Sequence, residues 1–187
     1  MALVIPTLII WLGAEAWLIV RQFGQGGPAK TTEWATLGVI LLSLWVGTAL
    51  AAVTDSTVPQ ATIPVRPVVT FEVGLLVAWA GIVFRLVSIH ILGRYFRYVV
   101  HVQQAHQVVQ SGPYRVIRHP AYAGLLVAMI GFGLTHHNLA SLAVLVGCSL
   151  VGVLYRIRVE ERVLHAELGS AYADYTNRTA RLIPGVW

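Results

Sequence analysis

Long apolar runs set the strongest limit on how this chain can fold. They cover residues 3–20, 34–53, 68–92, 120–134 and 139–155. A helix needs about 20 apolar residues to cross roughly 30 Å of hydrocarbon, and the first three runs are close to that length. We therefore expect an all-α integral membrane protein with about five transmembrane helices.

Composition and the order of the runs indicate a single membrane domain over residues 1–187. Hydrophobic residues make up 57% of the chain and charged residues 11%, whereas a soluble domain carries about 25% charged residues. We expect two N-terminal transmembrane helices within residues 1–67 and the remaining helices within residues 68–187. The first run lacks a basic n-region and a cleavage site, so we expect a retained span rather than a signal peptide.

Basic residues define the expected topology. With five spans, the first and third connectors share one side of the membrane with the C-terminal segment. That side carries eleven basic residues: Arg21, Lys30, Arg94, Arg97, Arg115, Arg118, Arg156, Arg158, Arg162, Arg178 and Arg181. The other side carries only Arg66, so we expect an external N-terminus and a cytoplasmic C-terminus. Because basic residues flank the apolar runs, we expect them to contact anionic lipid headgroups and not nucleic acid.

Two charged residues interrupt the apolar runs. Glu15 either faces a wet cavity in the bundle interior or is a carboxyl near the interface, hydrogen-bonded to a neighbouring helix. Arg85 either extends towards the headgroups or is a cation that faces an internal anionic ligand. The sequence leaves both pairs of alternatives open.

The stretch from residue 106 to 124 combines polar, aromatic and turn-forming residues. Gly112-Pro113 predicts a turn, and His119-Pro120 predicts the start of a helix, because Pro is tolerated in the first turn. Residues 95–109, just before, are expected to be extended or irregular. His101, His106 and His119 match no zinc motif, so no metal is expected. The alternative interpretation is a basic loop that anchors two membrane helices.

The last two apolar runs predict a helical hairpin. Only the residues Thr-His-His-Asn at 135–138 connect them, and such a short link forces antiparallel helices. Glycines are expected to let these helices pack closely: Gly124, Gly131, Gly133, Gly147 and Gly152. Beyond Arg156 the chain becomes polar with an apolar stripe at helical spacing. We therefore expect the fifth helix to leave the bilayer and to continue as an amphipathic segment to about Tyr175.

Two motifs together resemble a known enzyme family. The sequence G-P-Y-R-V-I-R-H-P-A-Y-A-G occupies 112–124, and R-x-x-x-E-E-x-x-L occupies 156–164, followed by L-G-S-A-Y-A-D-Y and R-L-I-P-G. This order resembles the isoprenylcysteine carboxyl methyltransferases and the related phospholipid methyltransferases, which are membrane enzymes that use S-adenosylmethionine. The resemblance covers roughly residues 68–185, makes residues 68–187 a methyltransferase core, and is closest to the short prokaryotic form.

The resemblance implies a set of site residues. Contacts to S-adenosyl-L-methionine are expected from His101, His106, Gln107, Val108, Val109, Tyr114, His119, Pro120, Ala121, Tyr122 and Glu160. Arg156 matches the family's substrate-side arginine, and Arg156 and Glu160 are the expected catalytic residues. Arg85 is a second candidate for binding substrate. The resulting cofactor pocket would lie between the 94–124 stretch and the C-terminal helix and tail, on the cytosolic side.

The spacing of Arg156 and Glu160 fits these roles. Residues four apart project from one helical face, where the carboxylate could hold cationic or ribose groups of the donor and the arginine could pair with an acidic acceptor. The structural alternative is a surface ion pair worth about 0.3–0.5 kcal/mol. We assign Arg158, Glu161 and Arg162 to such surface pairing. A carboxylate acceptor is already ionised and needs no general base, which favours it over an amine or a thiol.

The expected function is S-adenosylmethionine-dependent methylation of a lipophilic acceptor that enters from the bilayer, most simply the carboxylate of a prenylcysteine-like substrate. Methylation of a phospholipid amine or a small thiol is the alternative within enzymes. A non-catalytic membrane scaffold or transporter subunit is the alternative from another class. The expected location is a prokaryotic cell membrane with the active site facing the cytoplasm, and the sequence gives no oligomeric state.

Overall fold

The structure, a computed structural model, describes residues 3–23, 34–95 and 108–185, and the regular elements in these ranges are helices. The α-helices are α1 (Val4–Phe23), α2 (Trp34–Thr57), α3 (Pro67–Leu92), α4 (Pro120–Thr135), α5 (Leu139–Leu168) and α6 (Ser170–Thr176). Three short 3₁₀ helices are η1 (Pro59–Ala61), η2 (Gly93–Tyr95) and η3 (Gly112–Arg115). The five predicted spans are confirmed as helices, and the extended segment predicted before residue 108 lies largely outside the described residues.

Local sequence explains where the helices begin and end. Pro67 and Pro120 occupy first-turn positions of α3 and α4, where an intrahelical N–H partner is absent anyway. The Asn138 side chain caps α5 by accepting hydrogen bonds from the amides of Ala140 and Ser141. Gly169, at a φ of 54°, ends α5 and starts α6, a conformation that residues with a Cβ rarely adopt. The predicted helix start at His119-Pro120 is confirmed.

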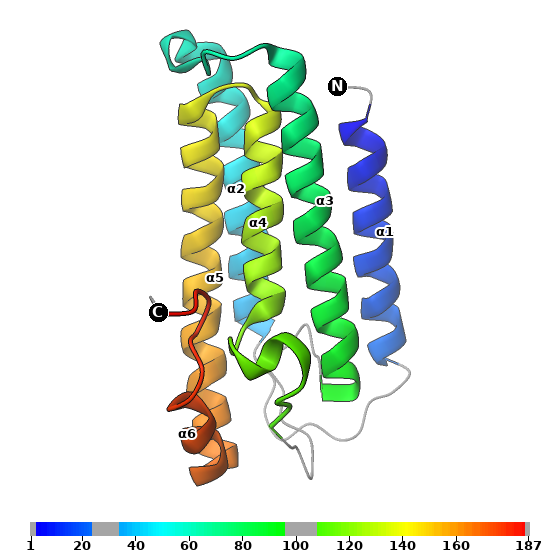
Figure 1. Cartoon of the computed structure of the whole chain (residues 1–187), viewed down its shortest axis with the longest axis vertical. Coiled ribbons are helices and arrows are strands. Elements are labelled where there is room, and N and C mark those ends of the chain that lie inside the picture. The colour runs from blue at the N-terminus through cyan, green and yellow to red at the C-terminus, as the bar shows by residue number, and fades with distance from the viewer. Residues whose placement is uncertain (1–2, 24–33, 96–107, 186–187) are drawn as a thin grey trace.

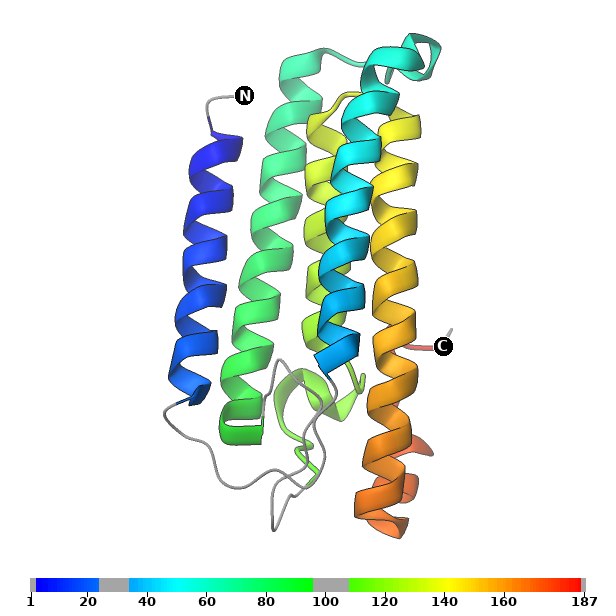
Figure 2. The ribbon, with the colours of Figure 1, turned by 180° about the vertical axis from the view of Figure 1, so that it is seen from behind.

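The long helices form an elongated bundle (Figures 1 and 2). Helices α4 and α5 form the predicted antiparallel hairpin, α2 packs along α5, and α1 lies beside α3 at the edge of the bundle. Helix α5 continues past the ends of its neighbours, and α6 packs against this projecting part. The fifth helix therefore leaves the bundle as predicted, and an additional helix follows it.

Helices α3 and α4 approach each other closely at glycines. A Cβ atom on Gly81 would overlap the backbone of Ala128, and one on Gly131 would overlap the backbone of Ala78. Small residues at such positions let two backbones touch, which drives helix association in lipid. The predicted role of glycine in close packing is confirmed at Gly124, Gly131, Gly133 and Gly152, but it is wrong at Gly147, where an added Cβ would meet none of the described residues.

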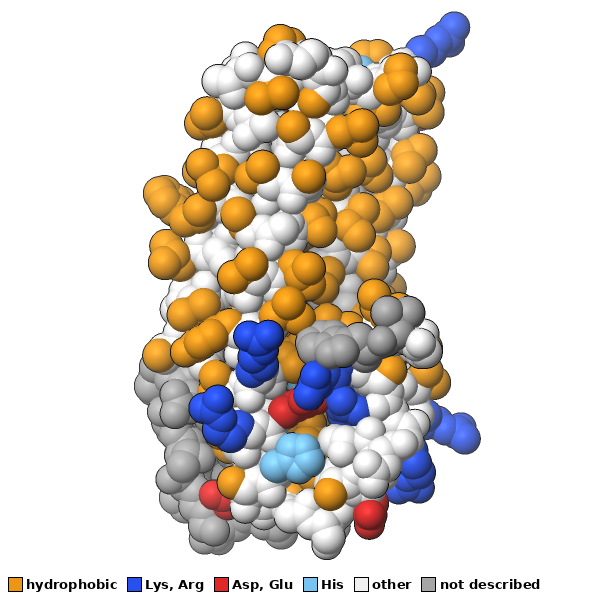
Figure 3. Space-filling model, turned by 90° about the vertical axis from the view of Figure 1, so that its left-hand side faces the viewer, with side chains coloured by type: hydrophobic (Ala, Val, Ile, Leu, Met, Phe, Trp, Pro, Cys, Tyr) orange, Lys and Arg blue, Asp and Glu red, His pale blue; other side chains and the backbone are white. Residues whose placement is uncertain are grey.

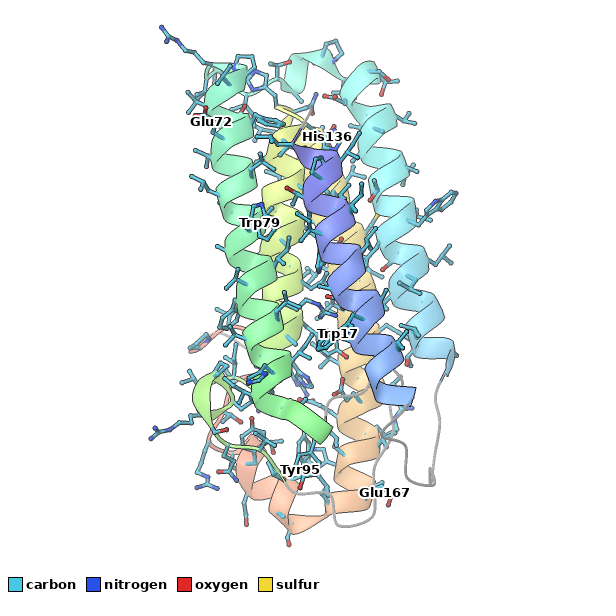
Figure 4. The ribbon with its side chains drawn as sticks, turned by 90° about the vertical axis from the view of Figure 1, so that its right-hand side faces the viewer. Trp17, Glu72, Trp79, Tyr95, His136 and Glu167 are labelled. Atoms are coloured by element: carbon cyan, nitrogen blue, oxygen red, sulfur yellow. The ribbon has the colours of Figure 1, made fainter. Side chains whose placement is uncertain are left out.

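The surface fits a bilayer around most of the bundle. Hydrophobic side chains cover the helices, while charged side chains gather at the end where α5 projects (Figure 3). Glu72 and His136 lie near one end and Tyr95 and Glu167 near the other (Figure 4). Helices α2, α3 and α5 are long and apolar enough to cross a membrane, and α4 and most of α1 are shorter apolar helices. The chain is an integral membrane protein.

Candidate functional site

A hydrogen-bonded network joins the start of α4 to α5. The Tyr122 hydroxyl donates to Glu160 Oε2 at 2.8 Å and accepts from Arg156 Nε at 2.5 Å. Arg156 and Glu160 are one turn apart, so α5 presents both to the first turn of α4. The Arg156 guanidinium carbon also lies 5.9 Å from the centre of the Tyr122 ring. The structure thus brings together three of the predicted site residues.

Arg156 is buried and bonded from two other helices. Its side chain is among the most enclosed charged groups described, with the residue 3% exposed. Besides the bond to Tyr122 on α4, its Nη1 donates to Thr36 Oγ1 on α2 at 3.0 Å. An arginine that is so enclosed is not the exposed surface ion pair that the sequence left open as an alternative.

Glu161 corrects one interpretation of the sequence. We expected a surface ion pair, but Glu161 is buried and accepts hydrogen bonds from Arg118 Nε at 2.8 Å and Arg181 Nε at 2.8 Å. His119 Nε2 lies 3.3 Å from Glu161 Oε1. Burial alone would raise the pKa of the Glu161 carboxyl, but hydrogen bonds and charges of His119 and Arg118 outweigh it and lower the pKa to about 2. Glu161 therefore stays ionised and joins α5 to the segment before α4.

The same segment pairs with the tail that follows α6. The amide of Arg118 donates to the carbonyl of Ala180, and the amide of His119 donates to the carbonyl of Arg181. Ala180 in turn donates to the carbonyl of Val116. The Arg118 guanidinium also bonds the carbonyls of Thr176 and Thr179. Side-chain and backbone bonds together hold the tail against the entry to α4.

Tyrosines fill the space next to this tail. Tyr114 is buried, donates from its hydroxyl to the carbonyl of Ser88 at 3.2 Å, and accepts at its own carbonyl from Tyr175 Oη at 2.7 Å. Tyr172 packs edge-on against His165 at 4.8 Å between ring centres. Burial raises the pKa of Tyr114, Tyr172 and Tyr175, so these phenols stay neutral and can donate hydrogen bonds.

Glu15, which is half-buried, and Arg85, which is buried, form an ion pair between α1 and α3. Arg85 Nε donates to Glu15 Oε1 at 2.6 Å and Arg85 Nη2 donates to Oε2 at 3.1 Å, while Trp11 Nε1 also donates to Oε1. The remaining Arg85 Nη1 donates to the carbonyl of Ala121. Arg85 does not extend towards the headgroups, and one anion that it faces is Glu15. A role for Arg85 in binding substrate stays a prediction.

The other predicted cofactor residues fall into two groups. Pro120 and Ala121 are buried in the first turn of α4, directly before Tyr122, and Val108 and Val109 are half-buried ahead of η3. His101, His106 and Gln107 lie outside the described residues, so their predicted contacts stay predictions.

Some site residues gave no usable signal in the sequence. Thr36 lies in an apolar run that looks like lipid-facing helix, and Arg118 and Arg181 lie within the two motifs but are not among the expected site residues. Each acquires a role only through a partner far away in the chain. The L-G-S-A-Y-A-D-Y segment belongs to the second motif, and its Tyr172 and Tyr175 could have been expected at the site on that basis.

The residues present fit a cationic donor with a nucleoside part. Glu160 offers a carboxylate, and buried tyrosines around it offer flat apolar surfaces. Tyr172 Oη is a buried polar atom with no hydrogen-bond partner within the described part of the chain. Buried polar atoms are nearly always bonded, so this hydroxyl is available to a ligand.

The fold and the site define a helical integral membrane protein with a polar, partly buried site where its helices end. A model of the isoprenylcysteine carboxyl methyltransferase (ICMT) family matches residues 73–166, which is half of the chain. The chain therefore belongs to the isoprenylcysteine carboxyl methyltransferase family. The match includes α4, the network of Tyr122, Arg156 and Glu160, and most of α3 and α5.

Individual relatives agree with this assignment. The chain is 31% identical over 117 residues to a probable protein-S-isoprenylcysteine O-methyltransferase of Oryza sativa, covering 60% of each chain. It is 31% identical over 113 residues to the protein-S-isoprenylcysteine O-methyltransferase of Saccharomyces cerevisiae, covering 59% of this chain and 47% of that one. The structure of the eukaryotic intramembrane Ras methyltransferase ICMT matches with a TM-score of 0.59 and 23% identity, over 84% of this chain and 55% of that one. That last likeness establishes the fold.

Proposed function

We propose that the protein transfers a methyl group from S-adenosylmethionine to the carboxylate of a lipophilic, prenylcysteine-like acceptor. The chain spans about 60% of the rice relative and 47% of the yeast relative, so the activity of those proteins comes to this chain as a proposal. Both relatives are named as methyltransferases that act on isoprenylcysteine.

One observation carries the proposal. Within the region that matches the family, the Tyr122 hydroxyl bonds a carboxylate, Glu160, and a buried cation, Arg156. A carboxylate suits a positively charged donor, and a buried arginine suits an anionic acceptor. Two groups of opposite charge, held by one phenol, support a reaction in which a cation and an anion meet.

Methyl transfer requires this chain to align the donor and the acceptor, and it requires no covalent bond to a side chain. When bound, S-adenosylmethionine would supply a methyl group on a positively charged sulfur. Glu160 would hold cationic or ribose groups of the donor, and Arg156 would orient the acceptor carboxylate. Because opposite charges neutralise in the transition state, a site that excludes water favours the reaction. An ionised carboxylate needs no proton removed, so the network needs no general base.

The topology supports access for both reactants. The site lies at the end of the bundle where charged side chains gather (Figure 3). By the distribution of basic residues this end faces the cytoplasm, where the donor is made. The acceptor's lipid chain would reach the site laterally from the bilayer. We propose prenylated cysteine derivatives or prenylated proteins as the acceptor class.

The binding of S-adenosylhomocysteine, the product of the donor, tests the proposal. Calorimetry on detergent-purified protein should show binding by the wild type and a loss of affinity of at least tenfold in Glu160→Ala, because the carboxylate is removed. Glu167→Ala is the matched control, an exposed glutamate on the same helix. A folded wild type that binds no S-adenosylhomocysteine overturns the proposed function.

A further inference from the structure

The Arg156 side chain has a partner outside the region that matches the family. Thr36, on α2, is 1% exposed, and its Oγ1 accepts a hydrogen bond from Arg156 Nη1 at 3.0 Å. The family match begins at residue 73, well after α2 ends. A residue of the N-terminal pair of helices therefore contacts the candidate acceptor-binding arginine directly.

The packing of α2 on α5 explains why these two residues meet. The helices are antiparallel, and their contacts keep one register along their length. Ser141 Oγ donates to the carbonyl of Ala51 near one end. In the middle, a Cβ on Gly47 would approach the carbonyl oxygen of Leu145 at 3.4 Å.

One turn before Arg156, the same register brings Gly152 against α2. A Cβ on Gly152 would lie 3.3 Å from the Ile40 Cα atom and would overlap the Ser43 side chain. Ile40 is in turn one helical turn beyond Thr36. The missing side chain at Gly152 therefore lets the two backbones come close, and Thr36 is then opposite Arg156.

We propose that Thr36 is a positioning residue for the reaction, which holds the Arg156 guanidinium in the orientation that binds the acceptor carboxylate. This inference rests on the proposed function. An arginine side chain has many rotamers, and hydrogen bonds from Nε to Tyr122 and from Nη1 to Thr36, on two different helices, fix the orientation of its guanidinium plane.

The chemistry of the Thr36 hydroxyl suits this role. A hydroxyl oxygen accepts a hydrogen bond without carrying a charge, so Thr36 can orient the Arg156 guanidinium without adding a negative charge beside it. The contrast with Arg85 is direct, because Arg85 donates two hydrogen bonds to the carboxylate of Glu15. A neutral partner orients the cation, whereas a carboxylate also compensates its charge.

Three variants separate orientation from packing. Thr36→Val keeps the shape and removes the acceptor oxygen, and Thr36→Ser keeps the oxygen. Thr48→Val is the matched control, because Thr48 is exposed on the same helix and its hydroxyl donates to the carbonyl of Leu44 one turn before it. Methyl transfer would be measured with S-adenosylmethionine and a farnesylated cysteine with a free carboxylate.

The expected result is a selective loss in Thr36→Val. Its kcat/KM for the acceptor should fall about tenfold, since a misplaced binding group costs rate even far from the chemistry. Its affinity for S-adenosylhomocysteine and its Tm should stay close to those of Thr48→Val. Thr36→Ser should retain most of the wild-type rate, because serine keeps the oxygen that accepts the hydrogen bond from Arg156.

A second readout does not depend on turnover. The Nε–H resonance of Arg156 in a ¹⁵N NMR spectrum, assigned by its absence in Arg156→Lys, should shift or broaden in Thr36→Val and stay unchanged in Thr36→Ser and Thr48→Val. An unchanged resonance in Thr36→Val would overturn the inference. So would a changed resonance with wild-type kcat/KM, since the bond would then be structural only.

Failure of the proposed function gives a different pattern. In that case the wild type itself binds no S-adenosylhomocysteine or transfers no methyl group to the acceptor, and the positioning role is rejected with it. If the wild type is active and Thr36→Val matches Thr48→Val in both readouts, only the role of Thr36 is rejected.

Discussion

At the scale of single residues, Tyr122 has the central place in the site. Its hydroxyl uses its hydrogen for Glu160 and a lone pair for Arg156, so one atom connects the two residues expected to bind donor and acceptor. Its ring lies 5.7 Å from the ring of His119, which belongs to the cluster around Glu161. The hydroxyl and the ring of Tyr122 can therefore be tested separately.

Replacing Tyr122 by Phe should damage function more than folding. The ring and its packing remain, while Arg156 and Glu160 lose their shared partner, and hydrogen bonds to charged groups contribute about 1.5–3 kcal/mol each. We expect methyl transfer to fall by about tenfold or more at temperatures where the variant is folded, and the Tm to fall as well because these bonds are lost. Tyr155→Phe is the control, because Tyr155 is an exposed tyrosine on α5. Equal activity of the two variants would contradict a role for the Tyr122 hydroxyl.

Adjacent residues show what sequence can and cannot predict at this scale. Glu160 and Glu161 are chemically identical neighbours, but a helix turns by about 100° per residue, so they face different partners. Glu160 meets Tyr122, as the family motif implied, whereas Glu161 meets Arg118 and Arg181. Which arginines lie opposite a given helical face depends on how distant segments pack. The local sequence therefore does not predict these partners.

At the scale of elements, the helices were predictable because the thickness of the bilayer limits them. Apolar runs of about 20 residues predict transmembrane helices, and proline and glycine mark the ends of these helices. Which helices pack against each other was harder to predict from the sequence. The hairpin of α4 and α5 followed from its short link, but the packing of α2 on α5, and of α1 beside α3, depends on residues such as Gly152 and Glu15.

Helix α1 supplies a prediction at this scale, because an ion pair with the buried Arg85 joins it to α3. Glu15→Leu should destabilise the protein by about 3–5 kcal/mol, since it leaves the Arg85 charge buried without this partner. The double variant with Arg85→Leu should be more stable than Glu15→Leu alone, because an apolar pair can replace a buried ion pair. Thermal unfolding in detergent measures both, with Glu72→Leu as an exposed control. Purely additive losses would contradict this account of the pair.

At the scale of the whole molecule, the chain consists of a lipid-embedded bundle and a polar cap at one end. The family match covers most of α3, all of α4 and most of α5, while α1, α2 and the tail lie outside it. These outer parts still contact the site. Thr36 comes from α2, and the tail returns to the bundle, where Leu182 is buried in the hydrophobic core. The site is therefore a property of the complete bundle and its tail.

In acid, the tail that follows α6 should detach from the segment before α4. Glu161, beyond the predicted span that ends at residue 155, has its pKa lowered from 4.5 to about 2. The unfolded or detached state thus binds the proton more readily, and the stabilisation is fully present above pH 4.5 and is lost as the pH falls towards 2. The loss should be on the order of 3 kcal/mol. Hydrogen exchange at the amides of Arg118, His119 and Ala180 should show falling protection over this range.

Glu161→Gln separates this titration from general acid unfolding. Without the carboxylate, the three amides should already be less protected at pH 7, and their protection, corrected for intrinsic exchange, should change little between pH 4.5 and 2. Glu167→Gln should behave like the wild type, because Glu167 is exposed and lies outside the cluster of Arg118, His119 and Arg181. Constant protection in the wild type down to pH 2 would show that Glu161 does not hold the tail. The tail would then be held by its backbone hydrogen bonds alone.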